Sequence, residues 1–411
     1  MRMHRLVPRI SLPRAQAMVL SRAHRLRSTE EMPLWSAAGR MTAERVVASI
    51  PVPPFPSANV DGYAVRAADL GRAAPRTPVD LALVGEIHAG EVFSRRMRAG
   101  ETVAVATGAP VPEGADTVEM FERVEARGTT VRFRGQVPAG HNVDAKGADL
   151  ARGTLVAGKG VVLTPPVLGA LGVSGVATIR VVARPKVAIL AHGQELAAPG
   201  TELRPGHVFE MNTTTLSAVV TGSGGLPLPR PPVPDDEDSL EEALRSATAE
   251  ADLVVISGGS SVGERDLLGK VFPRLGTVLF HGIRVRPGMP TIACVSEGKL
   301  VLGMPGHPAS CLVNALWLVG PVVRKLGGYP GEGAHVTSVT MAADARVHGG
   351  GFTTVVPLRI EDGKAWPTFH GSHFITSLAG ANGYAIVPPA RRALRKGDRI
   401  DARTLDYLGG R

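Results

Sequence analysis

Short, uninterrupted apolar runs that each end in glycine or a polar turn constrain this chain more than any other feature. Residues 187–190 (VAIL), 253–256 (LVVI) and 300–302 (LVL) are such runs. Apolar throughout and only a few residues long, they are typical of strands buried on both faces. Helix signals lie between them, including Asn212 as a possible cap and the Ser-x-x-Glu capping box that starts at Ser239. This alternation predicts a parallel sheet with helices on both faces.

The regions on either side of this α/β segment indicate β structure. Short valine-rich runs separated by Gly, Pro and Asp fill residues 60–178, and similar runs recur at 352–356 and 385–387. The chain has 49 glycines and 33 prolines among 411 residues, which indicates many turns without low complexity. Amphipathic spacing predicts a helix over 11–26, and residues 308–326 predict a long apolar helix.

Composition excludes several classes of function. The net charge is +9, but no basic stripe is interleaved with aromatic residues, so we expect an anionic small-molecule ligand and no nucleic acid. Cys294 and Cys311 have no Cys-x-x-Cys spacing, which disfavours a disulfide framework and a structural zinc site. No run approaches about 18 uninterrupted apolar residues and the N-terminus lacks a secretory signal, so we expect a cytoplasmic protein that does not cross a membrane.

The glycine-rich segment 257–266 (SGGSSVGERD) is the strongest candidate for ligand binding. It follows a predicted buried strand and precedes a helix, where backbone N–H groups and the helix N-terminus favour an anion. Ligands of open α/β sheets bind at this end of the strands. The alternative is a plain tight turn. The residues with backbone or hydroxyl donors are Ser257, Gly258, Gly259, Ser260, Ser261 and Gly263.

Three further segments lie at predicted strand ends. Residues 304–310 (MPGHPAS) form a rigid loop before a helix, and residues 286–290 (RPGMP) hold one fixed cation suited to an oxyanion. Residues 191–196 (AHGQEL) place Glu195 where it could bind a metal or a sugar hydroxyl. Taken alone, each segment also fits a simple surface turn, and His192 and His307 fit ordinary surface histidines.

Acidic residues outside these loops have structural alternatives as well. The Asp-Gly of residues 61–62 is typical of a hairpin turn, and Asp116 fits a structural role. The acidic run 235–238 precedes a helix, where negative charge is favourable. As metal ligands, such carboxylates suit a hard cation such as magnesium.

In this order and spacing, the segments resemble the molybdopterin molybdenumtransferase family, which includes the E domain of gephyrin. The resemblance runs from about Ser11 to Pro389 and rests on these matching segments: 53–65, 107–116, 147–149, 193–196, Asn212, 258–266, 286–290, 305–310 and 381–383.

The resemblance implies an α/β plus β multidomain fold: a central three-layer α/β domain, an inserted β domain, an elongated helical N-terminal domain and a C-terminal β domain. The corresponding ranges are 181–328 for the α/β domain, 51–144 for the inserted domain, 1–50 plus 145–180 for the N-terminal domain and 329–411 for the C-terminal domain. It also implies a homodimer, with the active site where the α/β domain faces the partner's β domain.

The implied activity is that of a transferase: insertion of molybdate into adenylylated molybdopterin with release of AMP, forming molybdenum cofactor. The resemblance assigns catalysis to Asp61, Thr107 and Asp149 on the β-domain side and to Glu195, Asp235 and Asp266 on the α/β side. The last three would also hold Mg²⁺. Substrate would contact Ser257 to Gly263, and the remaining substrate-binding residues are Arg286, Pro305, Gly306, Pro308 and Ser310.

This chain departs from the family's usual motifs at several positions. Met289 stands where the family usually has lysine, His307 where it has asparagine, and Asp144 where a basic residue is common. Two alternative functions therefore stay open at this point: a non-catalytic paralogue that binds or delivers the cofactor, and a molybdopterin adenylyltransferase acting one step earlier.

Overall fold

The computed structural model describes residues 9–258, 266–330, 336–348 and 350–405. The chain forms two compact units, one from Met1–Glu30 with Val182–Arg411 and the other from Glu31–Val181. The second unit is therefore an insertion in the first. The chain crosses between them at β1 (Thr29–Pro33) and β12 (Thr178–Val182), which pair with each other. Each unit is described by itself.

The larger unit contains the six-stranded α/β sheet expected from the apolar runs. Its strand order is β16-β13-β17-β21-β20-β18, and the first four strands run parallel. β20 is antiparallel to both of its neighbours, so β18 points the same way as β21. The bounds are β13 Lys186–Ala191, β16 Leu226–Pro229, β17 Leu253–Ser257, β18 Thr277–His281, β20 Ile292–Ser296 and β21 Lys299–Met304.

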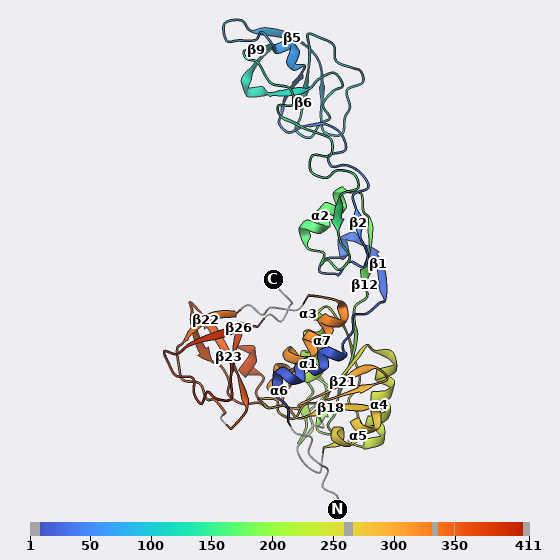
Figure 1. The fold of residues 1–411 in the computed structure, drawn as a ribbon, viewed down its shortest axis with the longest axis vertical. Coiled ribbons are helices and arrows are strands. Elements are labelled where there is room, and N and C mark those ends of the chain that lie inside the picture. The colour runs from blue at the N-terminus through green and yellow to red at the C-terminus, as the bar shows by residue number, and fades with distance from the viewer. Residues whose placement is uncertain (1–8, 259–265, 331–335, 349, 406–411) are drawn as a thin grey trace, which may run out of the picture. The chain divides into compact units, whose positions relative to one another are not determined.

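Alternate residues of the central strands enter two different cores, which confirms helices on both faces of the sheet. In β17, Leu253 and Val255 pack in one core, and Val254 and Ile256 pack in the other. Helices α4 (Glu237–Glu250) and α5 (Leu267–Leu275) cover the second face (Figure 1). The first face is covered by α1 (Leu12–Arg22), α3 (Asn212–Gly222), α6 (Pro308–Asn314) and α7 (Gly320–Gly327).

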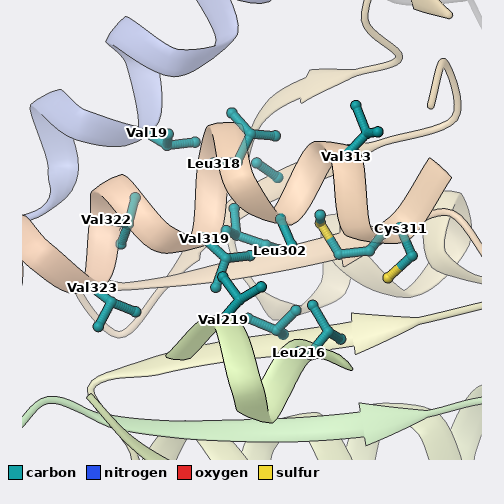
Figure 2. Close-up of a cluster of buried hydrophobic side chains, with 14 of the residues drawn as sticks. Val19, Leu216, Val219, Leu302, Cys311, Val313, Leu318, Val319, Val322 and Val323 are labelled. Carbon is teal, nitrogen blue, oxygen red and sulfur yellow. The ribbon is translucent and has the colours of Figure 1, made fainter. Parts of the chain in front are cut away.

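The long apolar helix predicted at 308–326 is present, with one irregular turn. Between α6 and α7 the chain takes five residues of π-helix, Ala315–Val319. The continuous run Pro308–Gly327 passes a test of length and hydropathy for a membrane span, but 72% of its most apolar window is buried inside the protein. Its side chains pack against β21 and α3, and Figure 2 shows Val319 in this core beside Val219 of α3.

Helix α1 belongs to the α/β core. Leu12, Ala15 and Val19 are buried in the same cluster as the central strands, and Figure 2 shows Val19 beside Leu318. Within residues 9–50, α1 is the one α-helix that the structure describes. The helical N-terminal domain expected for 1–50 plus 145–180 therefore stays a prediction. In that range, Leu34, Leu163 and other buried residues form a small core beside α2 (Pro165–Val173).

The C-terminal β structure of the larger unit is a six-stranded sheet of order β19-β23-β24-β22-β26-β25, with an extra β23–β25 pairing. Its strands are β19 Val285–Arg286, β22 Val336–Met341, β23 Thr353–Glu361, β24 Lys364–Pro367, β25 Gly383–Val387 and β26 Arg399–Thr404. β19 comes from the α/β segment, so this sheet is joined to the α/β region within one unit.

The smaller unit contains a six-stranded sheet of order β7-β4-β6-β5-β9-β8, as the valine-rich runs predict. Its strands are β4 Gly62–Val65, β5 Val79–Ile87, β6 Glu101–Val105, β7 Thr117–Met120, β8 Val124–Arg127 and β9 Thr130–Phe133. The segments before and after this sheet in the sequence form a short antiparallel pair, β3 (Ser57–Ala58) with β10 (Val143–Asp144). The fold is therefore multidomain, α/β plus β.

Candidate functional site

The candidate site lies along one edge of the α/β sheet, at the carboxyl ends of its parallel strands. The register places Ala191, Ser257 and Met304 side by side at the ends of β13, β17 and β21. The loops after these strands contain three of the four segments singled out from the sequence. This is the edge at which open α/β sheets bind ligands.

Backbone hydrogen bonds join the three loops. The N–H of His192 donates to Ser257 O at 2.9 Å, and the N–H of Gly258 donates to Met304 O at 3.2 Å. Gly258 has φ +95° and lies so close to the first loop that a Cβ would stand 2.1 Å from the carbonyl O of His192. Glycine is therefore required here by both conformation and space.

Part of the glycine-rich segment falls outside the described residues. Ser257 and Gly258 are buried at the end of β17. Four predicted ligand-binding residues lie beyond the part of the chain that the structure describes: Gly259, Ser260, Ser261 and Gly263. Their assignment stays a prediction.

His192 is buried, and the expectation of a surface histidine is wrong. The residue is 6% exposed, because it continues the buried strand β13 and bridges to Val233. Its Nε2 lies 3.2 Å from Oδ1 of Asp235, yet among the described residues this atom has no aligned hydrogen-bond partner. Glu195, three residues further on, is exposed and folds its carboxylate back over Gly193.

The acidic run before α4 supplies the helix cap one turn earlier than the sequence suggests. The side chain of Asp236 accepts the N–H of Ser239 at 2.7 Å, so α4 begins at Glu237 and the capping box predicted at Ser239 is wrong. The Ser239 N–H is also the main reason why the pKa of Asp236 lies below its ordinary value. An Asp cap satisfies a free N–H and its charge suits the helix N-terminus.

Asp266 caps α5 and also lies in contact with a histidine. Its Oδ1 accepts the N–H of Gly269 at 3.0 Å, and its Oδ2 lies 2.9 Å from Nε2 of His281, the last residue of β18. The Asp266 side chain is 12% exposed. This carboxylate is therefore largely buried and held at the start of α5.

The loop 286–290 is fixed from beneath by Asn314 of α6. Its amide nitrogen donates to Gly288 O at 2.6 Å and to Thr291 Oγ1 at 2.7 Å. Arg286 itself is exposed, and its guanidinium stacks over the ring of Phe352. Arg286 is the last residue of β19, and its role toward an oxyanion stays a prediction.

Arg286 lines a pocket of ≈ 230 Å³ against the C-terminal sheet. Arg346, His348 and Thr354 are also in its wall. Burial is the main cause that lowers the pKa of His348, and the positive charges of Arg286 and Arg346 lower it further. Asp344 is also in the wall, but it pairs with Arg395 at 2.8 Å, so the pocket's two arginines leave its charge net positive, which suits an anion.

The loop 305–310 connects β21 to the long helix and is pinned at Gly306. Pro308 takes the first helical turn, as the sequence predicts, and Ser310 is buried. The side chain of Asn212 donates to Gly306 O at 2.9 Å, so the expectation that Asn212 caps α3 is wrong. Its Oδ1 is buried with no hydrogen-bond partner among the described residues.

In the smaller unit, Asp61 and Thr107 come together although 46 positions separate them. Oδ1 of Asp61 accepts the backbone N–H of Thr107 at 2.7 Å and its hydroxyl at 2.8 Å. These bonds, the backbone one first, lower the pKa of Asp61. Asp149 lies on a separate turn, where its N–H donates to Val52 O. All three side chains are exposed.

The predicted metal ligands do not form a cluster in the described part of the chain. Over residues 9–258, 266–330, 336–348 and 350–405, no group of three or more His, Cys, Asp or Glu side chains could hold a metal ion. Asp235 and Asp266 each lie beside a histidine instead. The magnesium site therefore stays a prediction.

Fold and site together define a multidomain α/β protein whose candidate ligand loops gather at the carboxyl ends of parallel strands. Three family models match in succession: MoeA N-terminal region (domain I and II) over residues 10–175, probable molybdopterin binding domain over 188–325, and MoeA C-terminal region (domain IV) over 340–405.

Full-length relatives agree with these matches. A molybdopterin molybdenumtransferase of Haemophilus influenzae is 30% identical over 408 residues, covering 98% of this chain and 100% of that protein. One of Bacillus subtilis is 31% identical over 384 residues, covering 90% and 89%. The crystal structure of a molybdopterin biosynthesis MoeA protein from Pyrococcus horikoshii has a TM-score of 0.84 at 34% identity, covering 97% of this chain and 100% of that one. The chain belongs to the molybdopterin molybdenumtransferase (MoeA) family.

Proposed function

We propose that this chain inserts molybdate into adenylylated molybdopterin and releases AMP. The observation that carries the proposal is the set of three hydrogen-bonded loops at the ends of β13, β17 and β21, in a chain that matches named molybdenumtransferases from end to end. The carrier and adenylyltransferase alternatives are not favoured, because the full-length relatives are named for the transferase activity.

Both substrates are anionic, so the site must stabilise negative charge. Backbone N–H groups at strand ends, together with the Arg286 guanidinium, would bind the pyrophosphate and the molybdate oxygens. The loop held by Asn212 at Gly306 would orient them relative to the dithiolene sulfurs. Attack by an oxygen of water or molybdate would break the pyrophosphate bond, releasing AMP and leaving the other phosphate on the molybdopterin.

We also propose that Mg²⁺ takes part, with Glu195, Asp235 and Asp266 as its protein donors. Carboxylate oxygens are suitable donors, and Mg²⁺ commonly binds through only one or two carboxylates plus water and substrate phosphates. Such a site needs no group of three protein ligands. When bound, the ion would neutralise charge on the phosphate oxygens.

We further propose that the chain acts in the cytoplasm as a homodimer, with Asp61, Thr107 and Asp149 of the partner completing the site. Two free, buried cysteines suit a reducing compartment. Sedimentation of the purified chain at twice its 42.9 kDa mass would support the dimer, and sedimentation at the single mass would contradict it.

The activity is tested by incubating the purified chain with adenylylated molybdopterin, molybdate and Mg²⁺ and measuring AMP by chromatography. We expect AMP release that depends on molybdate. Glu195→Ala and Asp266→Ala should each lower the rate by on the order of 10²-fold, as removal of a transition-state contact does. Glu202→Ala, an exposed acid seven positions from Glu195, is the matched control and should leave the rate unchanged.

Two results would count against the proposal in different ways. Absence of AMP release by the folded wild-type chain overturns the function itself. Normal release by wild type, with both alanine variants within a few-fold of it, overturns the assignment of these two residues.

A further inference from the structure

Asp266 lies against a histidine that no motif assigns. Its Oδ1 accepts the N–H of Gly269 at 3.0 Å, and its Oδ2 makes an ion-pair contact at 2.9 Å with Nε2 of His281. The cap bond holds one carboxylate oxygen, and the imidazole packs against the other. Together the two contacts restrict rotation of the carboxylate about χ2, which the cap bond alone leaves free.

Gly269 makes room for this pair. It lies inside α5, where glycine is less favourable than alanine. A Cβ at this position would stand 2.5 Å from Oδ2 of Asp266 and 2.9 Å from Cε1 of His281. Glycine is therefore needed at position 269 because a side chain there would collide with Asp266 and His281, and the three residues pack against one another.

The second histidine–aspartate pair of the site has a more exposed carboxylate. Nε2 of His192 lies 3.2 Å from Oδ1 of Asp235, and the Asp235 side chain is 30% exposed, against 12% for Asp266. Asp266 is the more confined of the two carboxylates, so contact with a histidine should influence its orientation more.

We propose that His281 is a positioning residue for the transferase reaction, acting through Asp266. The inference rests on the proposed function. His281 ends β18 and Asp266 directly precedes α5, so this contact joins the start of the helix to the end of the strand. Neighbours that orient a functional carboxylate typically matter by about 10- to 100-fold.

The test compares His281→Phe and His281→Gln in steady-state AMP release. We expect His281→Phe to lower kcat by about 10- to 100-fold with KM for adenylylated molybdopterin within about 3-fold, because the carboxylate remains but is misoriented. His281→Gln, which keeps an N–H donor, should recover most of the lost kcat. His88→Gln is the control, since His88 pairs with Glu86 at 3.8 Å on an exposed surface.

A second perturbation reaches the pair from the other side. Gly269→Ala should lower kcat, because its methyl group displaces the Asp266–His281 contact. The matched control is Gly169→Ala in α2, where a Cβ meets no atom within 4 Å, and its kcat should be unchanged. Combining His281→Phe with Asp266→Asn should lower kcat no further than Asp266→Asn alone, since the histidine acts only through that side chain.

The outcomes separate the inference from the function on which it rests. If wild type releases no AMP, the proposed function fails. If wild type is active and folded His281→Phe and Gly269→Ala both keep kcat within about 3-fold, the positioning role is refuted. A lower melting temperature with unchanged kcat in these variants also refutes it, because that result defines a purely structural contact.

Discussion

Replacement of Gly258 by alanine tests how tightly the strand-end loops are joined. The new methyl group would stand 2.1 Å from the carbonyl O of His192, a backbone atom that cannot rotate away. The residue also has φ +95°, a conformation that disfavours any side chain. Both effects act in the folded state, at the centre of the candidate site.

The two contributions can be separated in magnitude. The left-handed conformation costs an alanine about 1–2 kcal/mol. Relief of the close approach requires the loop that contains His192 to shift by about 1 Å, although the N–H of His192 is hydrogen-bonded to Ser257 O. Overpacking of this kind costs about 1–3 kcal/mol. Gly200→Ala has nearly the same conformation, φ +87°, with no atom within 4 Å of the added Cβ, so it reports the conformational part alone.

Differential scanning calorimetry of wild type, Gly258→Ala and Gly200→Ala measures the difference. The midpoint temperature for unfolding of the larger unit should fall further in Gly258→Ala than in Gly200→Ala. The additional loss of unfolding free energy is about 2 kcal/mol, which corresponds to a shift of about 4–8 °C. Because the chain has two units, the same transition must be compared in each variant. Equal shifts in the two variants would refute the argument that Gly258 is required for space.

Three further predictions concern stability and reactivity. Asp236→Asn should remove part of the acid sensitivity of the larger unit. The cap hydrogen bond lowers the pKa of Asp236, so the stabilisation that the cap provides is present above pH 3.8 and is lost as pH falls through the lowered pKa. Acid titration of unfolding would measure this loss. Asn314→Ala should destabilise by about 1–3 kcal/mol in urea unfolding, because Gly288 O loses a buried donor; a change below about 0.5 kcal/mol would contradict this. Burial raises the pKa of Cys294 to about 12 and also raises that of Cys311, so a thiol reagent at pH 8 should react with both only after denaturant is added.

The parts of the fold that the sequence predicts are those set by local patterns. The apolar runs ending near Leu190 and Ile256 identify strands because burial on both faces leaves no polar position. Caps are less predictable, since several residues compete for the same N–H groups. Asp236 displaces the box expected at Ser239, and Asn212 donates to Gly306 instead of capping its own helix.

The candidate site was predictable only where a motif gathers its residues in one loop. The hydrogen bond from Thr107 to Asp61 and the contact between His281 and Asp266 join residues from different segments, and strand order and register create both. No local rule distinguishes buried His192 from an exposed histidine, because the preceding strand decides its burial.

The position of α1 has a consequence for how the chain matures during synthesis. Its partners lie in the last turns of the long helix: Lys325 donates to Leu20 O at 2.7 Å, and the N–H of Leu26 donates to Leu326 O. These residues leave the ribosome some 300 positions later. Until then the apolar face of α1 lacks these partners, whereas the inserted unit can fold from a continuous stretch of nascent chain. A helix that is translated early is therefore among the last to become fully buried.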